Sequence, residues 1–81
     1  MSNDTLAKIK QILSAELGID ETEINLSSHL KEDFDADPIS VADLIVKLEE
    51  EFDLRIPQNQ ASEFKTVEDI LNYITDQTGD I

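Results

Sequence analysis

Three carboxylates alternate with other residues in the segment DFDAD, residues 33–37, which Pro38 follows directly. Oxygen ligands at this spacing form the first half of an EF-hand calcium loop. The second half is missing, because the sixth position holds Pro38 where the loop needs glycine, and the twelfth holds Leu44 where it needs glutamate. The pattern therefore disfavours an EF-hand and predicts no dedicated metal site. A loose divalent-cation site that screens the crowded carboxylates stays open as an alternative.

The other residues with reactive side chains give little support for catalysis. His29 is the single histidine, and no serine or cysteine stands with it in a recognisable catalytic motif. The chain has no cysteine, which excludes a disulfide framework, a thiol nucleophile and a cysteine zinc site. Paired carboxylates that hydrolyse a substrate need a concave pocket, for which 81 residues offer little room. The sequence therefore predicts a protein that is not an enzyme.

Charge limits the partners that the chain can bind. It has 19 acidic and 6 basic residues and a net charge of −13 at pH 7. This charge repels nucleic acid phosphates and anionic membranes, so we expect neither as a ligand and expect partner proteins with basic surfaces. Apolar residues make up 40% of the chain and recur in ordered patterns, which favours a folded core over disorder. The length predicts a single domain over residues 1–81.

The sequence also bears on location. No apolar run reaches membrane-spanning length, and the first ten residues, MSNDTLAKIK, lack the apolar stretch of a signal peptide. We therefore expect a soluble, cytoplasmic protein, and we expect it to be a monomer.

Helical spacing of apolar residues predicts a first helix over residues 4–17, which Gly18 ends. The next segment, residues 19–37, has no sustained period and is rich in Asp, Asn and Ser, so we expect a long loop with one helical turn near residues 28–31. Apolar anchors are expected to hold this loop to the core: Ile19, Ile24, Leu26, Leu30 and Phe34. Loops of this length in compact domains are often functional.

A second helix is expected to begin with Asp37 as N-cap and Pro38 as its first residue, since the missing proline N–H costs nothing in a first turn. The expected inner stripe of this helix holds Ile39, Leu44, Ile45, Leu48 and Phe52. Its acidic residues remain for solvent or for a partner: Asp43, Glu49, Glu50 and Glu51.

Two further elements complete the expected fold. The segment QNQASEF, residues 58–64, is long enough for only one or two helical turns. Thr66 is expected to cap a last helix, with Asp69 in a weaker form of the capping box, and Gly79 is expected to end it. Three full helices, one short helix and no convincing strand predict an all-α fold, a four-helix bundle with a short third helix.

The segment DADPISVADLIVKLEEEFDLRIP, followed by FKTVEDILNYI, resembles the acyl carrier protein family. The usual pattern of that family is Asp-Ser-Leu at the start of a helix, then an acidic Glu-Glu-Phe segment, then Ile-Pro, then a Thr-Val-x-Asp helix. The amphipathic first helix and the long acidic loop also match in order and length. The resemblance therefore covers nearly the whole chain.

This resemblance implies the acyl-carrier type of four-helix bundle and a carrier role. In that family, 4′-phosphopantetheine on a serine at the start of the second helix holds acyl or peptidyl intermediates as thioesters, for fatty-acid, polyketide or related biosynthesis. The acidic second helix docks onto basic patches of partner enzymes, which implies Asp43, Glu49 and Glu50 as docking residues here. The implied partners include a phosphopantetheinyl transferase and synthase or transferase enzymes.

The attachment motif departs from the family pattern. Without a gap, the motif's Asp falls on Asp37, its serine on Pro38 and its leucine on Ile39. Proline has no hydroxyl, so the phosphodiester cannot form there. Asp35 stands where the family usually has glycine. The nearest hydroxyl belongs to Ser40, which lies about 200° around a helix and about 3 Å along it from Pro38.

Two interpretations of Ser40 stay open. In the first, Ser40 is the attachment point for 4′-phosphopantetheine, and Ser40→Ala abolishes loading of a true carrier. In the second, its hydroxyl only helps to satisfy the exposed amides of the first helical turn. The chain would then be a scaffold or regulatory interaction protein that keeps the carrier fold and the docking face without a prosthetic group.

Overall fold

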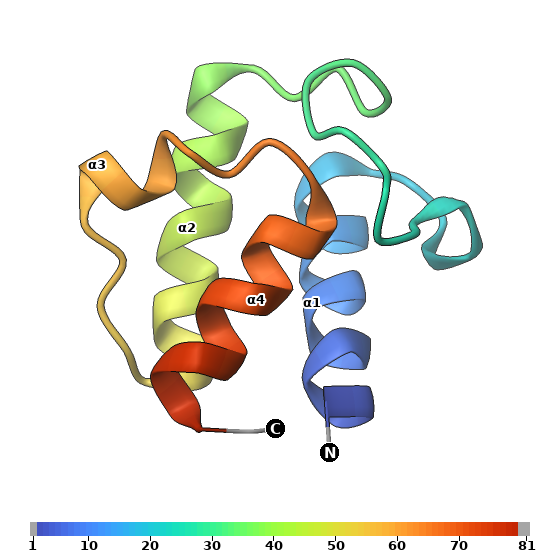
Figure 1. The fold of residues 1–81 in the computed structure, drawn as a ribbon. Coiled ribbons are helices and arrows are strands. Elements are labelled where there is room, and N and C mark those ends of the chain that lie inside the picture. Colours follow the sequence, from blue (N-terminus) through green and yellow to red (C-terminus); the bar gives the residue numbers. More distant parts are fainter. Residues whose placement is uncertain (1, 80–81) are drawn as a thin grey trace.

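Helices form where the apolar residues recur at helical spacing. The computed structural model of the protein describes residues 2–79 and contains α1 (Ser2–Leu17), α2 (Pro38–Phe52), α3 (Gln58–Ala61) and α4 (Val67–Thr78) (Figure 1). A short 3-10 helix, η1 (Glu21–Glu23), lies in the long loop after α1. Residues 2–79 contain no strand, only an isolated bridge between His29 and Thr66. The predicted all-α fold with a short third helix is confirmed.

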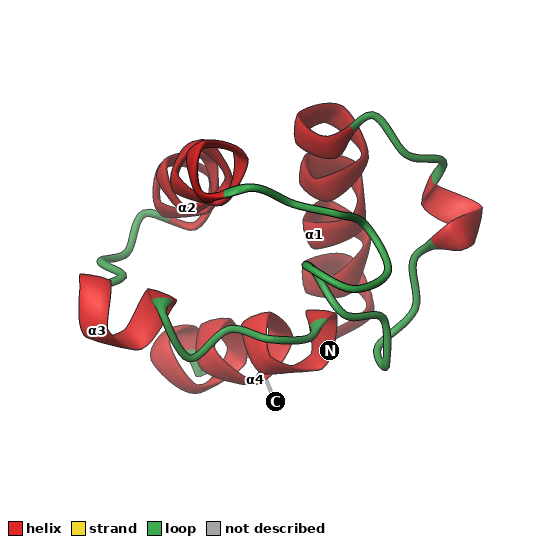
Figure 2. Ribbon diagram, turned by 90° about the horizontal axis from the view of Figure 1, so that it is seen from above, coloured by secondary structure: helices red, strands yellow, loops and turns green. Residues whose placement is uncertain are grey.

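One apolar core lies between the three long helices. The α1 helix packs against both α2 and α4, and α3 lies on the side of the bundle away from α1 (Figure 2). The fully buried large side chains come from all three long helices: Ile9, Leu13, Leu44, Leu48, Val67, Ile70 and Ile74. Each buried side chain of this size stabilises the fold by about 1.5–3 kcal/mol. Among residues 2–79, no helix is both long and apolar enough to cross a membrane.

The predicted N-caps of α2 and α4 and the predicted end of α4 agree with the structure, whereas α1 begins at Ser2, two residues before the predicted start. Asp37 is the N-cap of α2, and its side chain accepts a hydrogen bond from the Ser40 amide. Thr66 caps α4 in a full capping box with Asp69, in which each side chain accepts from the other residue's backbone amide. Gly79 ends α4 in the left-handed conformation, with a φ of 73°.

The long loop after α1 has its helical turn in a different place from the one predicted. Residues 28–31 are not helical, because Leu30 donates its N–H to the Lys65 carbonyl and Ser28 accepts from the Val67 N–H. These backbone groups are therefore committed to another segment of the chain. The helical turn is η1 instead, which Asp20 caps through the Thr22 amide.

Most of the expected loop anchors reach the core. Ile24 and Leu30 are buried, and Ile19 and Phe34 pack against the buried residues. Leu26 is 37% exposed, so its prediction as an anchor was wrong. The Leu26 carbonyl is nevertheless held, since it accepts a hydrogen bond from the Glu68 amide.

The predicted inner stripe of α2 was wrong at Ile39. This side chain is 75% exposed, whereas Leu44 and Leu48 are fully buried. A helix turns by about 100° per residue, so Ile39 lies about 140° around α2 from Leu44. Val41 and Ile45, which are half-buried against the core, complete the inner face in its place.

Asp53 ends α2 in a conformation that suits glycine. Its φ of 51° lies in the left-handed region, which costs a residue with a side chain about 1–2 kcal/mol. Its carboxylate also stands at the negative end of the helix dipole. We expect Asp53→Gly to raise the free energy of unfolding by about 0.5–1 kcal/mol. This gain is smaller than the backbone strain that is relieved, because glycine also gives the unfolded chain more conformational freedom.

Urea unfolding followed by circular dichroism measures this change. Glu50→Gly, within the same helix, is the control and should lower stability by about 0.5–1 kcal/mol. Equal destabilisation by both substitutions would contradict the assignment of strain to Asp53.

Candidate functional site

The start of α2 brings together the residues of the variant attachment motif. The Oδ1 atom of Asp37 accepts a hydrogen bond from the Ser40 N–H at 2.7 Å. Pro38, the first residue of the helix, is exposed. The amide of Ser40, and secondly its hydroxyl, lower the pKa of Asp37 below the ordinary value of 3.8. Asp37 is therefore a charged cap whose carboxylate lies beside the nearest available hydroxyl.

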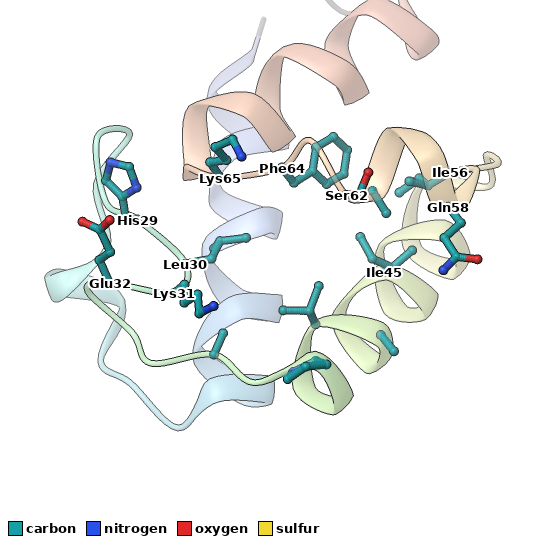
Figure 3. Close-up of a pocket in the computed structure, with 15 residues that line it drawn as sticks. His29, Leu30, Lys31, Glu32, Ile45, Ile56, Gln58, Ser62, Phe64 and Lys65 are labelled. Carbon is teal, nitrogen blue, oxygen red and sulfur yellow. The ribbon is translucent and has the colours of Figure 1, made fainter.

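An apolar pocket opens beside this helix start (Figure 3). Its volume is about 900 Å³, within the range of ~300–1,000 Å³ that is usual for small-molecule sites. The α2 helix contributes Pro38, Val41, Ala42 and Ile45, whose spacing places them in one stripe. Ile56 and Phe64 are among the residues that line the rest of the pocket. The expectation that 81 residues leave little room for a concave pocket was wrong, because the walls of this pocket come from segments far apart in the sequence.

Ser40 lies on a different side of α2 from this pocket. Pro38 lines the pocket and Ser40 does not. The residues four and eight positions after Ser40 are Leu44 and Leu48, which are fully buried, and Ser40 itself is half-buried. The expectation that Ser40 projects from another face than Pro38 is confirmed. Of the two positions, only Ser40 has the hydroxyl that a phosphodiester needs.

The other two acids of the DFDAD segment have separate roles. Asp33 accepts a hydrogen bond from the His29 N–H at 2.6 Å, which closes the loop. Asp35 has a φ of 54°, in the left-handed region that glycine adopts with least strain. Glycine is also the residue that the family pattern usually has at this position. Within residues 2–79, no group of three His, Cys, Asp or Glu side chains could hold a metal ion.

The acidic residues of α2 differ in their availability to a partner. Asp43 and Glu50 are exposed. Glu49 is half-buried, and its Oε2 atom accepts a hydrogen bond from the Ile56 N–H at 2.8 Å. This carboxylate therefore ties the end of α2 to the segment before α3, a role that the spacing of the acidic residues does not indicate.

Two exposed apolar residues share the face of α2 that holds Asp43 and Glu50. Ile39 is 75% and Val46 48% exposed. The four residues are spaced by four, three and four positions, so they form one continuous stripe. The spacing alone was sufficient to find this stripe, which we call the outer face of α2.

The hydrogen bonds of Ser40 predict the titration of Asp37. We expect its pKa in the folded protein to lie below 3.8, and Ser40→Ala to raise it part of the way back, since the amide bond remains. The charged cap then contributes stability at pH values above the unfolded pKa, and this contribution is lost as the pH falls through the folded pKa.

The ¹³C shift of the Asp37 carboxyl, followed against pH, measures this effect. Asp20 is the internal control, because its lowered pKa comes from Thr22 and should not respond to Ser40→Ala. An Asp37 pKa at or above 3.8 in the wild type would contradict the hydrogen bonding described for the cap.

Comparisons with known proteins agree with this architecture. Residues 7–74 match the family model described as "Phosphopantetheine attachment site". The chain is 41% identical over 80 residues to the acyl carrier protein of Borrelia garinii subsp. bavariensis, covering 98% of this chain and 100% of that one. It is 42% identical over 71 residues to the acyl carrier protein of Clostridium acetobutylicum, covering 88% and 92% of the two chains. The chain therefore belongs to the acyl carrier protein family.

Proposed function

We propose that the chain is a carrier protein for biosynthesis that bears 4′-phosphopantetheine on Ser40 and has no catalytic activity of its own. Membership of the family supports the carrier role and the identity of the prosthetic group. One observation supports the site: Ser40 is the only hydroxyl residue of α2, and it lies in the first turn, where the family pattern has its serine. The family position itself holds Pro38, which cannot be modified in this way.

The environment of Ser40 suits a phosphodiester. The positive end of the helix dipole at the first turn favours a negative group, although the Ser40 amide itself is already bonded to the Asp37 carboxylate. The Ser40 side chain is half-buried, so part of it is accessible to a transferase. In the transfer, the Ser40 oxygen would bond to phosphorus of coenzyme A, with loss of the hydroxyl proton and release of adenosine 3′,5′-bisphosphate.

Loading by a phosphopantetheinyl transferase tests the attachment site. With coenzyme A and a broad-specificity transferase, we expect the intact mass to rise by one phosphopantetheine, and fragmentation to place it on Ser40. Ser40→Ala should abolish the addition. Ser62→Ala, which removes an exposed serine elsewhere, should load as the wild type does.

A double variant, Pro38→Ser with Ser40→Ala, controls for recognition. It restores a hydroxyl at the family position, so its loading would show that the transferase accepts this fold. If this variant is loaded and the wild type is not, Ser40 is not an attachment site. The chain would then act as a carrier-fold scaffold or regulatory protein without a prosthetic group.

We further propose that the outer face of α2 docks onto basic patches of partner enzymes. Asp43 and Glu50 supply exposed negative charge, Val46 supplies exposed apolar surface between them, and Ile39 supplies it at the end of the stripe next to Asp43. Charge complementarity of this kind speeds association and orients the partners. Glu49 is a weaker candidate than the sequence suggested, because its carboxylate is bonded to the Ile56 amide. The proposed partners are a phosphopantetheinyl transferase and synthase or transferase enzymes. We propose that the chain binds them as a monomer in the cytoplasm.

Charge reversal tests the docking face. The double substitution Asp43→Lys and Glu50→Lys should weaken binding to the transferase roughly tenfold at low salt, and less at high salt, where charges are screened. Glu68→Lys with Asp76→Lys, at two exposed acids of α4, changes the net charge equally and is the control. Isothermal titration calorimetry gives both affinities. Equal losses for the two pairs would contradict a specific docking role for α2.

A further inference from the structure

A second, smaller groove lies between α1 and α2. Its volume is about 320 Å³, and four of the residues that line it come from the second half of α1: Gln11, Ile12, Ala15 and Glu16. Lys47 lines it from α2. None of these five residues lines the larger apolar pocket. We call this second site the α1–α2 groove.

Ser40 belongs to the same side of α2 as Lys47 and Glu51. Seven positions separate Ser40 from Lys47 and eleven separate it from Glu51, so each of the two lies within about 20° of Ser40 around the helix axis. Both of them face α1, because Lys47 lines the α1–α2 groove and Glu51 pairs with Lys8 at 3.6 Å. The side chain of Ser40 therefore projects toward α1 as well, which agrees with its being half-buried.

The directions of the two helices place Ser40 at one end of the groove. The α1 and α2 helices run in opposite directions, so the start of α2 lies beside the end of α1 (Figure 1). Lys8, in the first half of α1, pairs with the last turn of α2, whereas Glu16, in the last turn of α1, lines the groove. Ser40 precedes Lys47 by about 10 Å along α2, so it lies at the Glu16 end of the groove. An arm attached to Ser40 therefore enters the groove lengthwise.

The side chains of the groove match the middle part of a phosphopantetheine arm. Between its phosphate and its thiol, this arm carries geminal methyl groups, a hydroxyl and amide groups that both donate and accept hydrogen bonds. Ile12 and Ala15 offer apolar surface to the methyl groups, and Gln11 offers both a donor and an acceptor. Lys47 adds a donor and Glu16 an acceptor. Lys47 forms no ion pair within residues 2–79, so its ammonium group is available to a carbonyl oxygen of the arm.

We propose that the α1–α2 groove binds the 4′-phosphopantetheine arm of the loaded protein, with the methyl groups of the arm against Ile12 and Ala15. This role of the groove rests on the proposed attachment to Ser40 and deepens it, because it names the surface on which the arm lies. Pro38, at the position of the family serine, lies about 200° around α2 from Ser40 and lines the larger pocket. A change of two residues in the attachment point therefore places the arm on another side of α2.

NOE spectroscopy of the loaded full-length protein tests the proposal. Intact mass and fragmentation first establish that one phosphopantetheine is attached to Ser40. We then expect cross-peaks between the geminal methyl groups of the arm and the methyl groups of Ile12 and Ala15. Ala15→Glu, which fills the groove and adds a second negative charge beside Glu16, should abolish the cross-peaks to Ile12. Ala15 is exposed, so the variant is expected to fold.

Ala7→Glu is the matched control, since Ala7 is an exposed alanine of the same helix that does not line the groove. Its loaded form should keep the cross-peaks to Ile12. The proposal is overturned if the loaded wild type lacks cross-peaks to Ile12 and Ala15, or if the methyl groups of the arm contact Val41 and Ile45 in the larger pocket instead. Equal effects of the two glutamate substitutions would also overturn it.

Failure of the attachment itself is distinguishable from these results. It appears as the absence of the added mass on Ser40, before any NOE is measured, and it would overturn both the attachment and the role of the groove. A protein that is loaded on Ser40 but lacks the cross-peaks would overturn the role of the groove alone.

Discussion

Proline at the first position of α2 constrains both the start of the helix and the chemistry that is available there. Pro38 has no N–H to lose and a φ already close to the helical value, so it begins the helix at little cost. Asp37 then accepts the amide of Ser40, which lies in the same turn. In an alignment to the family pattern without a gap, the same proline takes the place of the serine, so this position has no hydroxyl. Any attachment to this helix therefore has to use Ser40, on another side of α2.

Hydrogen bonds outside the helices connect this helix start to the rest of the fold. The Ala36 N–H donates to the Leu30 carbonyl, and the Leu30 N–H donates to the Lys65 carbonyl just before α4. At the other end of α2, Glu49 accepts the Ile56 amide. The pocket lies among these connected segments, so the bonds that order the loops also hold Lys31 and Lys65 beside an apolar wall. Residues far apart in the sequence therefore line one pocket.

Features that depend on local spacing were predictable from the sequence. The caps at Asp37 and Thr66 are examples, because each involves a residue three positions away. The family pattern also led correctly to the fold. The error at Ile39 came from counting an apolar residue as buried although its angle around the helix places it outside. No feature of the sequence near Leu26 indicated that its side chain is exposed, since this exposure depends on how the loop packs against the helices.

Features that depend on tertiary contacts were not predictable in the same way. The sequence did not distinguish Glu49 from the other acidic residues of α2. Its hydrogen-bond partner, the Ile56 amide, is seven residues away in a loop whose conformation the sequence does not predict. The pocket combines the loop before α2, α2 itself and the segment around α3, so no single stretch of sequence indicated it. The same holds for the pairing of residues 30 and 65, which places two lysines at one opening.

We propose that 4′-phosphopantetheine is attached to Ser40 and not at the position of Pro38. A ³¹P–¹H correlation spectrum of the loaded protein tests it most directly, because through-bond coupling identifies the residue that carries the phosphodiester. We expect one phosphodiester signal, coupled to the β-protons of Ser40. A signal coupled to the β-protons of any other residue, or no phosphodiester signal under conditions that load the Pro38→Ser variant, would contradict it.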